Sequence, residues 1–153
     1  MKTYIITTII IAATFIFMGF YAEPNITCNA KALKDKTKES LDPYKYDSAE
    51  ITRIMYKNKD GFKEIEVPLF IGEKYKVVFN IEALPKPIEI SVYNKDKDSK
   101  NRTLLFSNKD KAFSEKQFSF EPSRTRHIYV DYSIPLADSS AASGCVVFMV
   151  GFK

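Results

Sequence analysis

A strict alternation of apolar and polar side chains around residues 74–82 restricts the fold more than any other feature of the chain. Apolar residues occupy every second position there: Tyr75, Val77, Phe79 and Ile81. Polar residues fill most of the positions between them, namely Lys74, Lys76, Asn80 and Glu82. Successive side chains of a β-strand point to opposite faces of the sheet, so one face of this strand must be buried.

Similar apolar runs, separated by turn residues, follow along the chain. We expect further strands at residues 51–57, 62–69, 88–92, 104–106, 118–120, 128–134 and 144–152. The Asp60-Gly61 pair between the first two runs is a strong hairpin signal. The last run is apolar on both faces, which is typical of a central strand. Seven to eight short strands predict an all-β fold, an antiparallel β-sandwich of jelly-roll or immunoglobulin-like type.

A short amphipathic helix is expected before the strands. Between Asn29 and Leu41, apolar or small residues recur every three or four positions, with charged residues between them. Asn29 is a suitable N-cap, and Pro43 ends the helix because the residue before a proline avoids helical geometry. The predicted division of the chain is 1–22 as a signal peptide or uncleaved anchor, 23–50 as an N-terminal helical and extended segment, and 51–153 as the β-sandwich domain.

The N-terminal segment resembles an export signal. Lys2 precedes an uncharged, largely apolar run that ends near Ala22. The same run is almost long enough to span a bilayer, so an uncleaved anchor is the alternative. Cys28 lacks the leucine and small residue that precede a lipid-bearing cysteine, which disfavours a lipoprotein. We therefore expect an exported protein, periplasmic or extracellular, or one anchored in the membrane with its domain outside the cytoplasm.

The chain has two cysteines, Cys28 and Cys145. In an oxidising compartment an isolated pair is most simply one disulfide, which here would join the two ends of the domain. Two separate thiols are the alternative. A metal site is not expected, because zinc needs about four ligands and His127 is the single histidine.

The charge balance and the motifs indicate neither nucleic-acid binding nor catalysis. Without residues 1–22, the 22 basic and 19 acidic residues leave a mild excess of positive charge spread along the chain, which does not favour a nucleic-acid partner. His127 stands at the entrance of a strand, and no G-x-S-x-G motif precedes it. We expect no enzymatic activity and no cofactor.

Acidic residues also suggest no defined site. The loop at 94–99 begins like a calcium loop, but Ser99 replaces the required glycine and Leu105 the bidentate glutamate, so a solvated hairpin loop is expected. Carboxylate pairs for glycoside hydrolysis could come from Glu64 with Glu66, or from Glu82 with Glu89. These residues fall on the polar phase of their strands, where charge is expected for solubility alone.

Aromatic residues are the remaining candidates for a binding surface. Tyr56, Tyr93 and Tyr129 fall on the opposite phase from their apolar neighbours, so we expect them to be available for contact with a ligand or partner. Exposed tyrosines can stack on sugars or anchor a protein partner. The alternative is that they are half-buried at a sheet edge or in a sandwich that is covered on both faces.

The region 67–152 resembles bacterial pre-peptidase C-terminal domains, which are small β-sandwiches of exported proteins. The similar segments are Gly72-Glu73-Lys74-Tyr75-Lys76-Val77, Ile88-Glu89-Ile90-Ser91-Val92-Tyr93-Asn94, Phe118-Ser119-Phe120-Glu121-Pro122 and Ile128-Tyr129-Val130. The glycine usual before the last strand is replaced by Thr125-Arg126-His127. The whole chain also resembles small exported bacterial β-sandwich proteins without an assigned activity. The resemblance implies a non-catalytic accessory or binding module.

Three functions remain open. The first is an exported binding module that engages an envelope protein or an extracellular glycan. The second is a structural envelope protein that is anchored by residues 1–22. The third is a small hydrolase, which would be indicated by a deep pocket in which groups such as Glu82, Glu89 and Asp131 converge.

Overall fold

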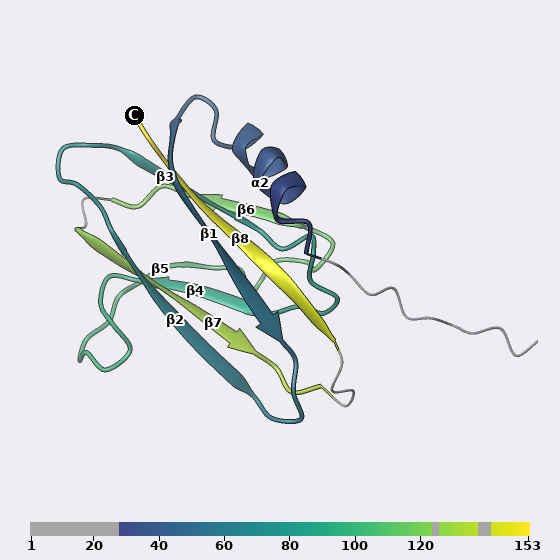
Figure 1. Ribbon diagram of the computed structural model, residues 1–153. Helices are drawn as coiled ribbons and strands as arrows, with labels where there is room; N and C mark the ends of the chain where they lie inside the picture. Colours follow the sequence, from purple (N-terminus) through teal and green to yellow (C-terminus); the bar gives the residue numbers. More distant parts are fainter. Residues whose placement is uncertain (1–27, 124–125, 138–141) are drawn as a thin grey trace, which may run out of the picture.

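The computed structural model describes residues 28–123, 126–137 and 142–153, which form one helix and two packed β-sheets (Figure 1). The elements are α2 (Ala30–Glu39), β1 (Lys45–Met55), β2 (Gly61–Pro68), β3 (Tyr75–Asn80), β4 (Glu89–Tyr93), β5 (Leu104–Ser107), β6 (Gln117–Phe120), β7 (His127–Ile134) and β8 (Ser143–Phe152). The expected all-β sandwich with a preceding helix is confirmed. The proposed signal or anchor at 1–22 lies outside the described residues.

Strand order identifies the sandwich as a jelly roll. One sheet has the order β1-β8-β3-β6 and the other β2-β7-β4-β5. The antiparallel pairs β1·β8, β2·β7, β3·β6 and β4·β5 nest inside one another along the chain, as in a long hairpin rolled into two sheets. This is the jelly-roll alternative of the two that the sequence left open.

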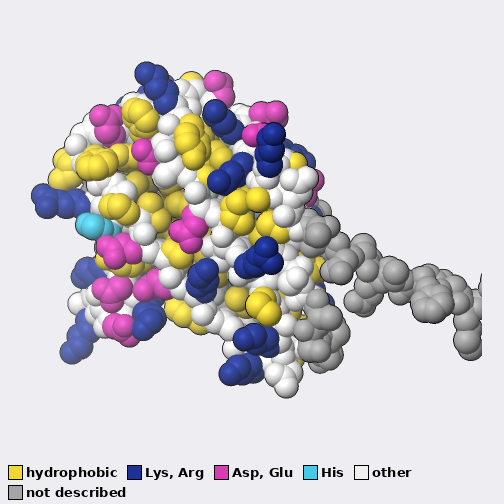
Figure 2. All heavy atoms as spheres, in the orientation of Figure 1, with side chains coloured by type: hydrophobic (Ala, Val, Ile, Leu, Met, Phe, Trp, Pro, Cys, Tyr) yellow, Lys and Arg dark blue, Asp and Glu magenta, His cyan; other side chains and the backbone are white. Residues whose placement is uncertain are grey.

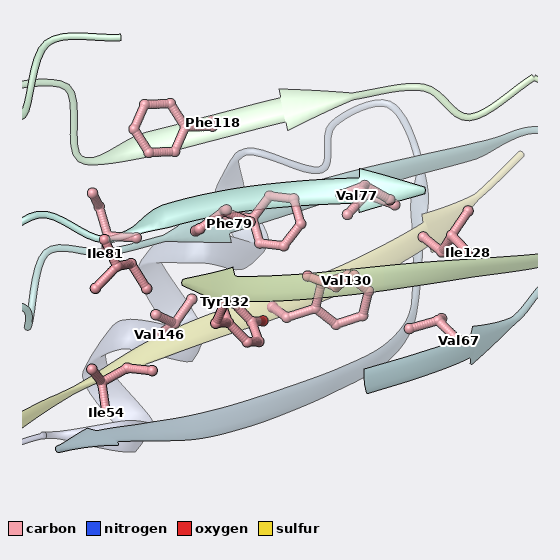
Figure 3. Packing of buried hydrophobic residues seen from close by; sticks show 14 of the residues in the cluster. Ile54, Val67, Val77, Phe79, Ile81, Phe118, Ile128, Val130, Tyr132 and Val146 are labelled. Atoms are coloured by element: carbon pink, nitrogen blue, oxygen red, sulfur yellow. The ribbon is translucent and has the colours of Figure 1, made fainter. Parts of the chain in front are cut away.

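The main core lies between the two sheets, where apolar side chains from both inner faces meet (Figure 3). Val77 and Phe79 of β3 are fully buried, as the alternation predicts. Phe79 stacks on Phe106 at 5.8 Å and packs against Phe148 at 5.4 Å between ring centroids. Aromatic contacts of this kind stabilise beyond simple burial, and here they tie β3 and β8 of one sheet to β5 of the other.

A second apolar layer explains why β8 is apolar on both faces. α2 covers the outer face of the β1-β8-β3-β6 sheet, and Leu33 of the helix packs with Val147 and Met149 of β8 (Figure 1). β8 is paired with β1 on one side and β3 on the other, so the predicted central strand is confirmed. The Asn29 side chain accepts a hydrogen bond from the amide of Ala32 at 3.2 Å, which confirms the N-cap.

The Cys28–Cys145 disulfide is present, with 5.8 Å between the two Cα atoms, and joins the residue before the N-cap of α2 to the central strand β8. A disulfide is typical of proteins from oxidising compartments. Among the residues that the structure describes, no helix is long and apolar enough to cross a membrane.

The first strand begins earlier than expected. β1 runs from Lys45, and residues 45–50, which we assigned to the N-terminal segment, pair with the end of β8. The register shifts between Tyr46 and Ser48, and the first four residues of β1 are exposed. These residues show little hydrophobic alternation because the backbone pairing with β8, and not a buried face, holds them in the sheet.

Gly144, at the start of β8, is required by a close backbone approach. A Cβ atom at this position would lie 2.2 Å from the carbonyl oxygen of Ala83, in the connection after β3. We expect Gly144→Ala to lower the free energy of unfolding by about 3 kcal/mol, because neither backbone segment can move without breaking the packing. Urea unfolding measures the loss. Gly61→Ala is the control, since its nearest contact would be an ordinary 3.4 Å to Ile134; equal losses for both variants would contradict this explanation.

Candidate functional site

The outer face of the β2-β7-β4-β5 sheet carries the candidate site. Unlike the opposite sheet, which α2 covers, this face presents polar and aromatic side chains. The register places Glu64 of β2 opposite Asp131 of β7. One step along the same face, Tyr129 of β7 lies between Glu66 of β2 and Tyr93 of β4. The sheet therefore brings two of the three predicted tyrosines together, although they are 36 residues apart in the sequence.

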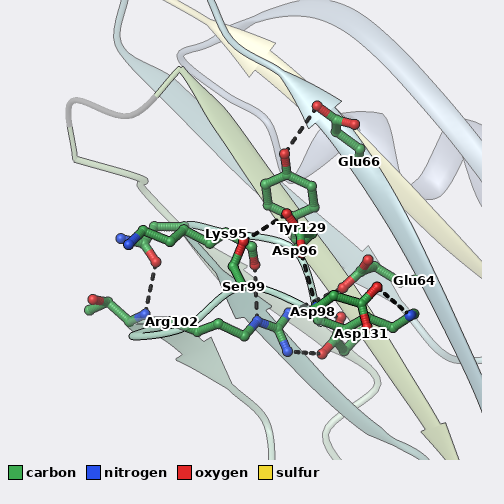
Figure 4. A network of polar contacts seen from close by, with 12 residues as sticks. Glu64, Glu66, Lys95, Asp96, Asp98, Ser99, Arg102, Tyr129 and Asp131 are labelled. Atoms are coloured by element: carbon green, nitrogen blue, oxygen red, sulfur yellow. Dashed lines mark hydrogen bonds and ion pairs between the residues drawn. The ribbon is translucent and has the colours of Figure 1, made fainter.

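Arg102 lies on this face and contacts its acidic side chains (Figure 4). Its Nη1 donates a hydrogen bond to Oδ2 of Asp131 at 2.9 Å, and its Nη2 donates to Oε2 of Glu64 at 3.2 Å. The guanidinium also lies 3.8 Å from the ring centroid of Tyr93, within the range of a cation–π interaction. Arg102 belongs to the β4–β5 connection, so these contacts fasten that loop to the sheet. We call Arg102, Glu64 and Asp131 the arginine clamp.

The clamp is largely shielded from water, and this sets its electrostatics. The exposed fractions of the three side chains are 18% for Arg102, 16% for Glu64 and 7% for Asp131. Burial raises the pKa of Glu64, and a hydrogen bond to Asp131 raises it further, whereas Arg102 and the Lys97 amide oppose the shift. Two ionised carboxylates this close repel each other unless a cation lies beside them, and Arg102 provides that cation. The clamp is therefore a structural element.

The β4–β5 loop is more ordered than the expected solvated hairpin. Asp96 accepts hydrogen bonds from the amide of Asp98 at 2.9 Å and from the hydroxyl of Ser99 at 2.9 Å. The Ser99 hydroxyl lowers the pKa of Asp96, so this carboxylate stays ionised. The loop is a hairpin connection as predicted, but it folds onto the sheet because Arg102 reaches back across it.

Beyond the clamp, the same face ends in an exposed group of polar and aromatic side chains. His127 Nδ1 lies 2.8 Å from Oε1 of Glu66, and the Tyr129 hydroxyl donates to the same oxygen at 3.2 Å. The exposed fractions are 47% for His127 and 53% for Glu66. Figure 2 shows the single histidine, in cyan, beside acidic and hydrophobic side chains at one side of the molecule. These groups are accessible to a partner, whereas the clamp is not.

The expectation that Tyr56 is a contact residue is wrong. Tyr56 is 1% exposed, and its hydroxyl donates a hydrogen bond to the carbonyl oxygen of Lys86. The pattern of β1 was misleading because both of its faces are apolar: Ile51 packs toward the helix layer and Ile54 toward the core. Tyr56 continues the phase of Ile54, so it enters the core.

Burial of Tyr56 leads to an alkaline pH dependence. Loss of solvation raises the pKa of its hydroxyl to about 12. The folded state therefore holds this proton more tightly than the unfolded state, in which the pKa is about 10. The contribution of this hydroxyl to the stability of the fold is complete below pH 10 and is lost as the pH rises toward 12.

We expect Tyr56→Phe to lower the free energy of unfolding by about 1 kcal/mol at pH 7, because it removes the hydrogen bond of the hydroxyl. The variant should also lose less stability than wild type at alkaline pH. Urea unfolding at pH 7 to 11.5 measures both effects. Tyr46 is exposed, so Tyr46→Phe should change neither the stability at pH 7 nor its loss at alkaline pH. The same response in both variants would contradict the assignment of the alkaline loss to Tyr56.

The sequence analysis missed the β2–β3 loop. Phe70 and Ile71 are 77% and 70% exposed, the highest values among the large hydrophobic residues in the described ranges. They precede Gly72, whose φ of 105° favours glycine. Two bulky apolar residues next to a turn glycine are a usable signal, because a tight turn cannot enter the core.

The loop adjoins the exposed end of the sheet face. Pro68 of β2 pairs with His127 of β7, and the next amide, that of Leu69, donates to the carbonyl oxygen of Arg126 at 2.7 Å. A cavity of about 770 Å³ lies between this loop and the residues that follow β6. We call the group formed by Glu66, Phe70, Ile71, His127 and Tyr129 the tip surface.

Glu82, Glu89 and Asp131, the groups that a hydrolase pocket would bring together, do not meet in one place. Glu82 forms an exposed ion pair with Lys36 of α2 at 2.6 Å, on the side of the other sheet. Glu89 lines a cavity at the far end of the sandwich, whereas Asp131 is enclosed in the arginine clamp. Within residues 28–123, 126–137 and 142–153, no three His, Cys, Asp or Glu side chains are grouped as a metal site would require.

The chain matches no protein-family model, no curated protein and no solved structure. The similarity to pre-peptidase C-terminal domains therefore stays a prediction.

Proposed function

We propose that this protein is an exported, non-catalytic binding module that engages an envelope protein through the tip surface. The observation that carries the proposal is the pair of bulky apolar side chains, Phe70 and Ile71, that project from a loop beside a polar rim. Protein interfaces commonly have this composition, in which a few apolar anchors provide most of the binding energy and polar groups surround them.

The rim supplies directional contacts. Glu66 and His127 are both about half exposed, and the Tyr129 hydroxyl is held by Glu66. These side chains offer a carboxylate, an imidazole and an aromatic ring within one small area. Because they project from paired strands, they lose little conformational freedom when a partner binds.

The arginine clamp supports the binding role indirectly. It holds β2, β7 and the β4–β5 loop together directly beside Tyr93, Tyr129 and Glu66. Its carboxyl groups are shielded and already paired, which makes them unsuitable as an acid and base for hydrolysis. The disulfide supports export, since such bonds persist in oxidising compartments.

An extracellular glycan is the second candidate, favoured by the position of Tyr129. Its ring is half-buried, and Glu66 and His127 lie beside it. An aromatic ring next to hydrogen-bonding groups suits a sugar, which stacks one face and bonds through its hydroxyls. A structural role with residues 1–22 as an anchor remains compatible with either ligand.

Site-specific cross-linking in the exporting cell tests the protein partner. A photo-reactive residue at position 71 should capture one protein, and the same residue at Lys31, on α2, should not. The captured protein is then purified and its affinity measured by calorimetry. Phe70→Ser with Ile71→Ser should weaken binding at least tenfold, whereas Leu136→Ser, which removes another exposed apolar side chain, should not.

The outcomes separate the candidates. Equal cross-linking from positions 71 and 31, or an affinity unchanged by the double substitution, would refute binding through the tip surface. Retention on a glycan array that is lost in Tyr129→Ala and kept in the Phe70 and Ile71 variant would favour the glycan.

A further inference from the structure

A mostly apolar cavity of about 620 Å³ opens at the end of the sandwich opposite the tip surface. It is bounded by the start of β2 and β4, the end of β7, and the loop between β5 and β6. Phe62, Phe113, Phe118, Ile88 and Ile134 provide most of its apolar lining. Its size lies within the range of small-molecule sites, about 300 to 1,000 Å³.

A smaller cavity of about 270 Å³ lies between the edge strands β1 and β2 and is strongly basic. Its lining contains four cations, Arg53, Lys57, Lys59 and Lys63, and one carboxylate, Asp60. The ion pairs found among the described residues include none of these four cations. Asp60 Oδ1 already accepts a hydrogen bond from the Leu136 amide at 2.9 Å. Four cations and one carboxylate give this lining a net charge of +3, compared with +4 for the whole chain.

The two cavities adjoin. Asp60, Gly61, Phe62 and Ile134 line both of them, and the Phe62 side chain is 52% exposed between the apolar and the basic space. Lysines on edge strands also prevent strands of two molecules from pairing. That role does not require an apolar cavity beside the charges, so the combination points to a ligand.

We propose that these adjoining cavities bind one molecule of an anionic amphiphile. Its apolar chain occupies the larger cavity, and its phosphate or carboxylate head contacts Arg53, Lys57, Lys59 and Lys63. Charge-assisted hydrogen bonds from several cations suit such a head, and the Phe62 ring covers the junction with the chain. The site lies at the other end of the molecule from the tip surface and does not depend on the function proposed there.

Calorimetry of the full disulfide-bonded domain with dodecyl phosphate, kept below its critical micelle concentration, tests the proposal. We expect saturable binding of one molecule. Dodecyl maltoside, which has the same chain and an uncharged head, and inorganic phosphate, which has no chain, should each bind at least tenfold more weakly. Raising the salt concentration should weaken binding of dodecyl phosphate.

Matched variants locate the site. Lys57→Gln with Lys59→Gln should weaken binding about tenfold, and both side chains are exposed, so the fold should be unaffected. Phe62→Ser should weaken it by a similar factor. Lys31→Gln with Lys34→Gln on α2 removes the same charge and should have no effect. Thermal melting of each variant confirms that it is folded.

Four results would overturn the proposal. The first is the absence of dodecyl phosphate binding. The second is equal binding of inorganic phosphate, which would reveal only an anion site. The third is an equal loss of binding in the α2 control, which would reveal only general charge attraction. The fourth is binding to phosphatidylglycerol vesicles without binding of the monomeric amphiphile, which would identify a membrane-docking surface instead.

Discussion

Removal of the disulfide by Cys28→Ala with Cys145→Ala is expected to lower the free energy of unfolding by about 5 kcal/mol. The bond closes a loop with a sequence separation of 117 residues, and loops of this length restrict the unfolded chain strongly. Alanine is preferred to serine because Cys145 is fully buried in the apolar layer under α2, where an unpaired hydroxyl would add its own cost. Urea unfolding of oxidised wild type and variant measures the difference.

Reduced wild type is the control for this experiment. It should unfold at nearly the same urea concentration as the double variant, because both lack the cross-link. A loss below about 1 kcal/mol would mean that the unfolded chain is already compact without the bond.

Arg102→Met is expected to cost about 3 to 5 kcal/mol at pH 7. The substitution leaves Asp131 and Glu64 shielded from water without their cation, and an uncompensated buried charge is strongly destabilising. Methionine retains much of the side-chain volume, so the loss reports charge more than packing. Arg53→Met is the control because this arginine is exposed and forms no ion pair with the described residues, and its effect should stay within about 0.5 kcal/mol.

The pH dependence of Arg102→Met distinguishes charge from packing. Arg102 opposes the rise in the pKa of Glu64 that burial and Asp131 cause, so without Arg102 this pKa rises further and the folded variant holds the Glu64 proton more tightly than the unfolded chain. The contribution of Glu64 to the stability of the variant is then complete at low pH and is lost as the pH rises through the carboxyl range. The deficit relative to wild type should therefore be smaller at pH 3.5 than at pH 7. An equal deficit at both values would assign the loss to packing.

Local patterns were sufficient to predict most of the strands, but the hairpin signal at Asp60-Gly61 was misleading, because β1 and β2 pair in different sheets. The alternation from Tyr75 to Ile81 predicted β3, and the run after Gly144 predicted a central strand. Both patterns reflect burial, which is recorded in the sequence as hydrophobic residues at fixed spacing. The choice between jelly roll and immunoglobulin-like fold could not be made, because it depends on which distant strands pair.

The arginine clamp was beyond prediction for the same reason. Glu64, Arg102 and Asp131 belong to three segments, and only the register of β2 with β7 and the course of the β4–β5 loop bring them together. Glu64 followed the polar phase expected of a solvated strand face. The loop that carries Arg102 shows a pattern of oxygen donors at 94–99, but nothing in the sequence indicates that Arg102 contacts Glu64 and Asp131.

The position of the disulfide also determines how the molecule carries mechanical load. A pull applied between the chain before Cys28 and the chain after Cys145 passes directly through the bond between the two Sγ atoms. The helix and β1 to β7 lie inside the closed loop and cannot be extended by this pull. Most of β8, residues 146–152, follows Cys145 and lies outside the loop, so a pull on the chain beyond it is resisted by the pairing of β8 with β1 and β3. Under oxidising conditions force can therefore remove at most this strand segment from the sheet, and extension of the rest of the domain requires reduction of the bond.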